Sequence, residues 1–326
     1  MKSKSFSALL AGVISSLLLS ACSASASSTP SLVLLTLEPS PSATPQSSAS
    51  PADHPTPTIS LPCTPDLCIH PGDFPLSRPI LPPGNDRVEG EYRYGYTQGG
   101  AREPHHGVEF SNPQGTLVQA AADGTVVYAG NDSKQVLGEY PGFYGNLVLL
   151  KHALPGFSSP IYTLYAHLSS IAAQTGQEVS RGDTLGEVGL TGTADGAHLH
   201  FEVRLGKPDY DHTANPELFV PPLPSVETGA PTGILIGRIE DEVGLPLTVP
   251  ITVQPLGETR IPGTATYPEL YGSGVPSSPE WNENFLAPDL PAGKYRIAFV
   301  YYSRVFEQTA EVIPGDITFV KITAKP

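Results

Sequence analysis

The chain has 326 residues, which is enough for two folded domains and a leader, since single domains cluster near about 100 to 150 residues. It contains 32 glycines and 36 prolines, and only 15% of its residues are charged. Long, charge-rich helices therefore have little material, which excludes coiled coils and helical bundles. Asp and Glu outnumber Lys and Arg by 32 to 18, for a formal net charge of −14. A surface of that sign repels phosphate backbones, so we expect no nucleic-acid partner.

The N-terminus has the features of an export signal. Lys2 and Lys4 precede a mainly apolar segment at residues 6–19, which is too short to cross about 30 Å of hydrocarbon but fits a signal-peptide core. Residues 19–22 read Leu-Ser-Ala-Cys and resemble a bacterial lipobox; a stray cysteine after an apolar run is the alternative. The resemblance implies a signal peptide at 1–21 and a lipid on Cys22 that anchors the protein in the membrane. We therefore expect a lipoprotein of the cell envelope that faces outside the cytoplasm.

A lipid-anchored linker is expected at residues 22–62. Of the 40 residues from 23 to 62, 29 are Ser, Thr, Pro or Ala, and none is Gly, Lys, Arg or aromatic. Such a composition cannot bury a core. Cys63 and Cys68 follow, and in an oxidising compartment their spacing favours a disulfide. A zinc site that adds His70 is the weaker alternative, because it would lack a fourth protein ligand.

Beyond residue 63 the pattern is that of an all-β protein. Short apolar runs recur about every 8 to 12 residues between Gly, Pro, Asn or Asp. A proline-dense break at residues 221–225 predicts a boundary between a domain at 63–224 and a second at 225–326. In the first domain, strands are expected at 117–121, 125–129, 147–151, 161–167 and 198–205.

The second domain is expected to be a small β-sandwich. Tyr295, Ile297 and Phe299 alternate with other residues, which predicts a strand with one buried face. Further strands are expected at 234–239, 249–255, 284–286, 310–313 and 317–322, so six or seven strands fit a sandwich. The turn-rich sequences at 237–247 and 290–295 resemble carboxypeptidase regulatory-like, transthyretin-like domains. That resemblance implies a fold and almost nothing about activity.

Six of the nine histidines lie between residues 105 and 200. In a strand at 198–205, His198 and His200 share one face with Glu202 and Arg204, while the apolar residues share the other. We expect the apolar face to be buried and the other to display both imidazoles. The two Cα atoms would lie about 6.6 Å apart, so one imidazole could bind a metal while the other addresses a water or substrate beside it.

His105 and Glu109 form a second cluster. On a fully extended strand they would be about 13 Å apart, too far for joint coordination, so a bend is required and Gly107 permits one. A carboxylate together with histidines on strand-like segments is a plausible catalytic zinc site, which keeps three protein ligands and one open position. The sequence has no HExxH motif, which excludes the helical arrangement of many metalloproteases.

The whole set of motifs resembles the LytM/lysostaphin family of zinc peptidoglycan endopeptidases. It begins with His105-x-Gly-Val-Glu109-Phe and continues, in the family's order, over about residues 90 to 205. The resemblance implies an antiparallel β catalytic domain that hydrolyses peptide cross-links or bridges of peptidoglycan with Zn²⁺ as cofactor. The remaining matching blocks are residues 115–127, 144–146, 164–168, 176–179, 182–183, 186–192 and 197–202.

The resemblance also assigns roles to individual residues. It makes His105, Glu109 and His200 the zinc ligands, and it makes His167 and His198 the catalytic pair. One of that pair acts as base toward water, and the other imidazole helps to stabilise the oxyanion. These roles agree with the chemistry of an imidazole, which titrates near neutrality. His106 and His152 match no family ligand and are interpreted as loop residues.

One departure from the family pattern keeps a second function open. The family typically has Asp where this chain has Glu109, and the extra methylene would move the carboxylate by about 1.5 Å unless the backbone adjusts. The alternative is therefore a non-catalytic regulator or binding protein that activates other cell-wall hydrolases. A third interpretation makes the C-terminal sandwich a glycan- or protein-binding unit, with Trp281 as its one tryptophan; a plain loop role for this residue is favoured.

Overall fold

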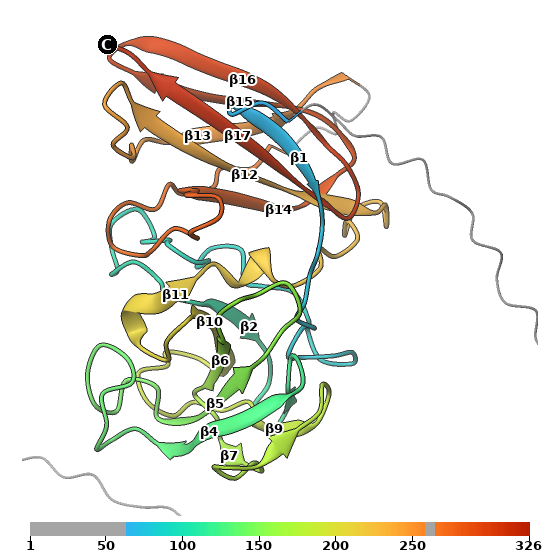
Figure 1. Cartoon of the computed structure of the whole chain (residues 1–326), viewed down its shortest axis with the longest axis vertical. Coiled ribbons are helices and arrows are strands. Elements are labelled where there is room, and N and C mark those ends of the chain that lie inside the picture. The colour runs from blue at the N-terminus through green and yellow to red at the C-terminus, as the bar shows by residue number, and fades with distance from the viewer. Residues whose placement is uncertain (1–62, 258–264) are drawn as a thin grey trace, which may run out of the picture. The chain divides into compact units, whose positions relative to one another are not determined.

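The computed structural model describes residues 63–257 and 265–326, and these are almost entirely β (Figure 1). The helices in these ranges are two short 3-10 turns, η1 (Tyr210–His212) and η2 (Pro216–Leu218). The all-β prediction is confirmed. Within the same ranges no helix has the length and apolar character needed to span a bilayer. The expected signal peptide, the lipid on Cys22 and the linker at residues 22–62 lie outside the described residues.

The N-terminal half is built on an antiparallel sheet in the order β11-β10-β6-β5-β4-β8, with β2 paired to the free part of β10. A second sheet has the order β3-β9-β7. Every strand expected in this half is present, with ends that differ by a few residues. The strand bounds are β2 Val108–Ser111, β3 Leu117–Gln119, β4 Gly124–Asn131, β5 Asn146–His152, β6 Ile161–Ala166, β7 Ser170–Ile171, β8 Glu178–Val179, β9 Thr184–Glu187, β10 His198–Leu205 and β11 Thr213–Ala214.

The C-terminal half is a sandwich of two sheets around a shared apolar core. One sheet has the order β1-β17-β12-β14 and the other β13-β15-β16. Inward-facing residues of both, such as Ile239, Ile297 and Val320, belong to one buried cluster. The bounds are β12 Thr232–Asp241, β13 Ile251–Pro255, β14 Phe285–Pro291, β15 Gly293–Tyr301, β16 Arg304–Val312 and β17 Asp316–Ala324.

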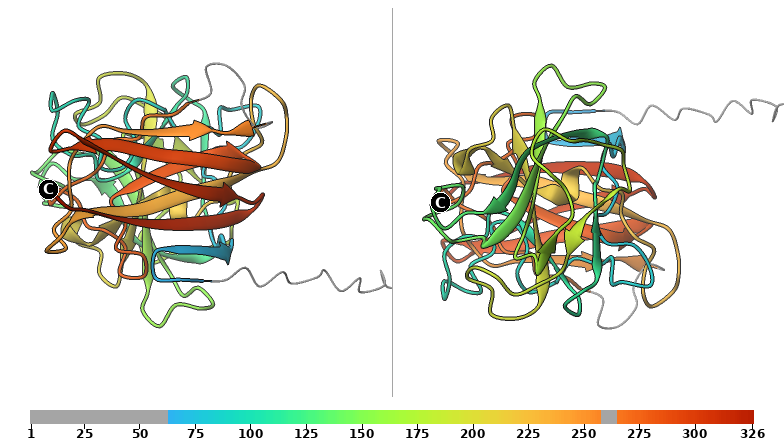
Figure 2. Two further views of the ribbon diagram at one scale, coloured as in Figure 1. Left: turned by 90° about the horizontal axis from the view of Figure 1, so that it is seen from above. Right: turned by 90° about the horizontal axis from the view of Figure 1, so that it is seen from below.

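One strand of this sandwich comes from the beginning of the described chain. β1 (Leu67–Pro71) pairs antiparallel with β17 along its whole length, and Figures 1 and 2 show it, in blue, beside the red strands. Cys63, which precedes β1, and Cys68 within β1 form the expected disulfide. Because their sulfur atoms bond each other, neither is left as a thiolate for the metal site with His70, although His70 Nε2 lies 2.8 Å from Cys68 Sγ.

The two halves share a continuous apolar core. The cluster that contains Val108 and Phe201 of the N-terminal half also contains Ile234, Tyr271 and Ile317 of the C-terminal half, all of them buried. Burial of apolar surface is the main favourable term in folding, so each half depends on the other for part of its core. The boundary near residue 225 stays a prediction from the sequence.

Candidate metal centre and active site

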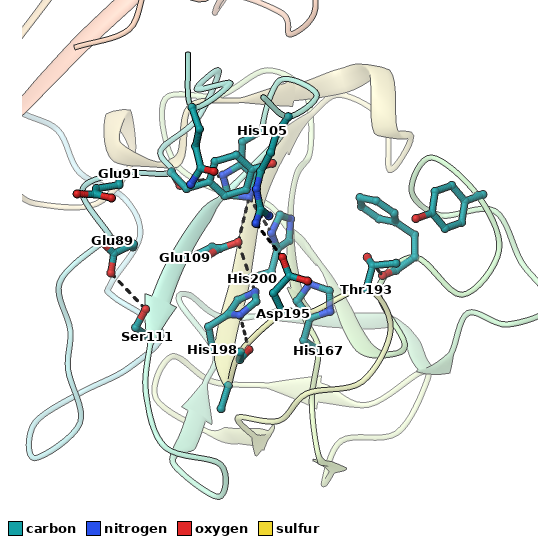
Figure 3. A pocket seen from close by; sticks show the side chains of 17 residues that line it. Glu89, Glu91, His105, Glu109, Ser111, His167, Thr193, Asp195, His198 and His200 are labelled. Atoms are coloured by element: carbon teal, nitrogen blue, oxygen red, sulfur yellow. Dashed lines mark hydrogen bonds and ion pairs between the residues drawn. The ribbon is translucent and has the colours of Figure 1, made fainter. Parts of the chain in front are cut away.

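A cleft of about 460 Å³ opens beside β10 and contains the five residues singled out in the sequence (Figure 3). Residues of the segment 89–111 form one wall, and residues of the segment 193–200, with Tyr140, Phe143 and His167, form the rest of the lining. The lining residues are Glu89, Glu91, Tyr92, Gln98, Arg102, His105, Glu109, Ser111, Tyr140, Phe143, His167, Thr193, Asp195, Gly196, Ala197, His198 and His200.

The pairing of β2 with β10 brings the three expected ligands together. His200 and Glu109 are opposite each other in the register of these strands, so their side chains share one face of the sheet. His105 lies before β2, where the chain bends, and its Nε2 is 3.8 Å from Glu109 Oε1 and 3.0 Å from His200 Nδ1. One potential ligand atom from each of the three residues lies within 4.8 Å of the others.

Gly107 is needed at this bend for a different reason from the one expected. Its φ is not in the left-handed region, so freedom of φ is not what the site requires. A Cβ at this position would lie 2.6 Å from the carbonyl oxygen of Phe201 and 2.9 Å from His200 Nε2. Glycine therefore allows the backbone before β2 to approach the imidazole of His200 closely.

The hydrogen bonds of the two imidazoles determine which nitrogens face each other. His105 Nδ1 is 3.0 Å from the carbonyl oxygen of Tyr92, and His200 Nε2 is 3.0 Å from Glu202 Oε1. Both partners are acceptors only, so these nitrogens carry the hydrogens, and His105 Nε2 and His200 Nδ1 carry lone pairs. Two lone pairs 3.0 Å apart repel, whereas a cation bound by both would remove the repulsion. With the carboxylate of Glu109, the donor set fits zinc.

His167 and His198 lie beside this group with their orientations fixed by backbone carbonyls. His167 Nδ1 donates to the oxygen of Thr191 over 2.8 Å, and His198 Nδ1 donates to that of Gly196 over 2.8 Å. Their ring centroids are 4.9 Å apart. His167 follows β6 with a φ of 62°, a left-handed conformation that is uncommon for a residue with a side chain and clusters at functional sites.

Both of these imidazoles are held in the neutral form. Burial, with the neighbouring His200 and His198, lowers the pKa of His167 to about 3. Burial also lowers the pKa of His198, although the nearby Glu109 carboxylate opposes this. His198 Nε2 is buried without a hydrogen-bond partner and lies 3.4 Å from Glu109 Oε1. A neutral imidazole with a free Nε2 is equipped to accept a proton.

A buried ion pair supports His200 from behind, and the sequence analysis did not find it. The expectation that this face of the strand displays both imidazoles is wrong, because His198 and His200 are buried and Glu202 and Arg204 are fully buried. Glu202 accepts hydrogen bonds from His200, from the hydroxyl of Tyr144 and, over 2.7 Å, from Arg204 Nε. Burial alone would raise the pKa of Glu202, but Arg204 and the hydrogen bond from His200 outweigh it and hold that pKa well below its ordinary value. The available signal in the sequence was that Glu202 and Arg204 share a strand face with His200.

The remaining histidines of the cluster lie outside the cleft. His106 is in a loop, as expected, where its Nδ1 is 2.9 Å from Thr213 Oγ1. The interpretation of His152 as a loop residue is wrong, because it ends β5 and is 1% exposed. Its two ring nitrogens lie 2.8 Å from the Asp123 carbonyl oxygen and 2.7 Å from Thr163 Oγ1. These bonds tie β5 to β6 and to the turn before β4, so the buried polar ring of His152 has a partner for each nitrogen.

Two histidines and a carboxylate that converge in an open cleft, beside two further histidines, form the kind of site that metallohydrolases use. Residues 103–213 match the model of Peptidase family M23, and this segment includes all five residues. The chain therefore contains a domain of the M23 peptidase type.

Named relatives of this segment include both an enzyme and an activator. The DD-carboxypeptidase/endopeptidase Mpg of Neisseria meningitidis is 40% identical over 105 residues, which are 32% of this chain and 21% of that protein. The murein hydrolase activator NlpD of Salmonella dublin is 33% identical over 111 residues, 34% of this chain and 25% of that protein. The chain thus spans about a fifth to a quarter of the length of these relatives.

A similar solved structure is the catalytic domain of the antimicrobial peptidase lysostaphin from Staphylococcus simulans. It has 27% sequence identity and a TM-score of 0.31, over 41% of this chain and 88% of that one.

Proposed function

We propose that the chain is a zinc-dependent endopeptidase that hydrolyses peptide cross-links or bridges of bacterial peptidoglycan. The observation that carries this proposal is the convergence of His105 Nε2, His200 Nδ1 and the Glu109 carboxylate, with the second nitrogen of each imidazole already hydrogen-bonded. When bound by these ligands, zinc supplies Lewis acidity toward water and an amide carbonyl. The endopeptidase name of the Neisseria relative supports the type of reaction.

In this proposal His167 and His198 move the protons. Each has its Nδ1 hydrogen fixed on a carbonyl oxygen, which leaves Nε2 as the basic nitrogen. One of these imidazoles accepts a proton from the attacking water, and the resulting imidazolium can donate a proton to the amine that leaves. The other imidazole lies beside it, with 4.9 Å between ring centroids. Because its Nδ1 hydrogen is already bound to a carbonyl oxygen, it would donate to the developing oxyanion only after its own Nε2 has taken up a proton.

Metal analysis tests the assignment of ligands. Purified protein should contain about one zinc per chain, and this stoichiometry should fall in His200→Ala but persist in His198→Ala. The pair is well matched, because the two residues are of the same type, two positions apart on β10 and similarly buried. Equal retention of zinc in both variants would refute the assignment.

Cleavage tests the activity. Residues 63–326 should release muropeptide fragments from peptidoglycan, detected by mass analysis, and a chelator should abolish the release. We expect loss of activity in His198→Ala despite bound zinc. Intact peptidoglycan after incubation with the zinc-loaded parent would contradict the proposal.

The regulator remains the second candidate, supported by Glu109 and by the activator name of the Salmonella relative. Glu109→Asp and Glu109→Ala separate the two functions. For an enzyme, we expect activity in the parent, activity largely kept or raised in Glu109→Asp, and none in Glu109→Ala. If the parent is inert on several peptidoglycan types and Glu109→Asp alone gains activity, the regulator takes the place of the enzyme.

The place of action is also part of the proposal. A lipid on Cys22 and the linker that follows would hold the peptidase on the membrane and let it reach the wall. Residues 23–62 would span on the order of 35 Å as a coil and about 120 Å when extended in polyproline geometry.

A further inference from the structure

The C-terminal sandwich contacts the chain segment that forms one wall of the cleft. This wall segment, residues 92–105, carries the candidate ligand His105 and also Tyr92, Gln98 and Arg102 of the cleft lining. Its other side packs on residues 269–276, which precede β14 of the sandwich. The cleft and the sandwich therefore share one segment of chain between them.

Glu269 binds the wall segment through three hydrogen bonds. Its Oε2 accepts from the backbone nitrogen and the hydroxyl of Thr97 over 2.8 and 2.9 Å, and its Oε1 accepts from the backbone nitrogen of Gly99 over 3.1 Å. Hydrogen bonds to a charged acceptor are stronger than those between neutral groups. Both carboxylate oxygens of Glu269 are thus used to fix the turn that leads to Arg102, whose backbone nitrogen bonds to the Thr97 oxygen.

Aromatic packing adds a second attachment. Tyr94 and Tyr271 are almost fully buried and pack edge to face with 5.5 Å between ring centroids. The hydroxyl of Tyr94 donates to the carbonyl oxygen of Pro276 over 2.7 Å. A Cβ on Gly95 would lie only 2.3 Å from Cβ of Tyr271, so the two backbones approach as closely as a glycine permits.

The attached residues are joined directly to the candidate metal ligand. The backbone nitrogen of Gly95 donates to the carbonyl oxygen of His105 over 2.7 Å, and the backbone nitrogen of His105 donates to that of Tyr96 over 3.1 Å. The ring of His105 stacks on Tyr92 at 4.0 Å, and its Nδ1 bonds to the Tyr92 oxygen. Both backbone polar groups of His105 and its imidazole are therefore positioned by the wall segment.

We infer that the C-terminal sandwich is a structural part of the active site, and that Glu269 is a positioning residue for His105 and the wall of the substrate cleft. The consequence for catalysis rests on the proposed function. The consequence for metal binding and for the order of the wall segment does not.

Backbone hydrogen exchange and metal affinity test this inference without any substrate. In Glu269→Ala, we expect amides in residues 92–106 to exchange about tenfold faster, while amides of β12 and β15 keep the exchange rates of the parent. The dissociation constant for zinc, measured by competition with a chelator, should rise about three- to tenfold, below the range seen for direct partners of a ligand. Glu269→Gln keeps one carbonyl acceptor and should give a smaller change.

Glu311→Ala is the matched control, because Glu311 is an exposed glutamate on β16 of the same sandwich. It should leave both measurements unchanged. Unaltered exchange in residues 92–106 of Glu269→Ala would overturn the inference, as would equally faster exchange in β12 and β15, which would show a general loss of stability.

Activity provides a separate measurement. If the parent cleaves peptidoglycan, Glu269→Ala should reduce kcat/KM in zinc-saturated protein while Glu311→Ala does not. If the parent does not cleave it, the proposed function fails, and the exchange and zinc measurements still decide the role of Glu269.

Discussion

Removing the charge of Glu202 should weaken both the fold and the metal centre. Glu202 is fully buried between His200 and Arg204. In Glu202→Gln, the guanidinium of Arg204 would remain buried without a countercharge, and loss of one partner of a buried ion pair costs about 3 to 5 kcal/mol. His200 would also lose its anionic acceptor. Loss of a group that hydrogen-bonds a metal ligand lowers metal affinity by about 10- to 100-fold. This corresponds to about 1.4 to 2.7 kcal/mol of binding free energy.

Arg204→Met separates the two effects. It breaks the same ion pair and should lower the free energy of unfolding by a similar amount, but it leaves the carboxylate that accepts the hydrogen bond of His200. Urea denaturation of the metal-free proteins measures the first effect, and competition with a chelator at a temperature where all variants are folded measures the second. We expect zinc affinity to fall more in Glu202→Gln than in Arg204→Met. Equal zinc affinity in the two variants would show that Glu202 does not act on the metal centre through His200.

Three further predictions follow from the fold and the sequence. A fragment of residues 63–224 should lack a cooperative unfolding transition, because it would lose part of the core cluster and also β17, the partner of β1. Cooperative melting like that of 63–326 would contradict this. Cys22→Ser should leave the membrane fraction or remain unprocessed, and fractionation that matches the parent would exclude the lipobox. Burial lowers the pKa of His152 in the folded protein. Below about pH 6.5 the unfolded chain therefore binds a proton that the folded chain does not, and the free energy of unfolding decreases as the pH is lowered. His152→Gln should reduce this dependence by up to about 1.4 kcal/mol per pH unit in urea titrations, and an unchanged slope would refute the role given to His152.

The parts of the site that follow from strand geometry could be predicted from the sequence. The period of two along residues 198–205 places His198 and His200 on one face, and the distance between His105 and Glu109 requires the bend that the structure contains. The partners of the imidazoles could not be predicted in this way. Tyr92, Thr191 and Gly196 bind them through backbone oxygens, which every residue type provides, so no sequence pattern marks these positions.

Pairing between strands that lie far apart in the sequence could not be predicted either. Residues 67–71 and 316–320 form adjacent strands, whereas the sequence pattern predicted only the second of them, at 317–322, and gave it no partner. The shared core likewise depends on contacts between the two halves, and the proline-dense break at residues 221–225 gives no sign of them. Local alternation determines which face of a strand is apolar, whereas the neighbour that covers the face is set by the tertiary fold. For β10 the covering network includes Tyr144, which makes its polar face buried as well.

The glutamate at position 109 illustrates how the fold accommodates a departure from a family pattern. The four residues of β2 pair with β10 in continuous register, with Glu109 opposite His200, so the longer side chain is accommodated without a bulge in the strand. Its Oε1 lies 3.8 Å from His105 Nε2 and 3.4 Å from His198 Nε2. The carboxylate is therefore beside a candidate ligand and a candidate base at once, and its charge opposes the lowering of the pKa of His198 by burial. A shorter aspartate on the same backbone would draw the carboxylate back by about 1.5 Å. Metal affinity and the basicity of His198 should thus change together at this position, which is why Glu109→Asp is informative about both candidate functions.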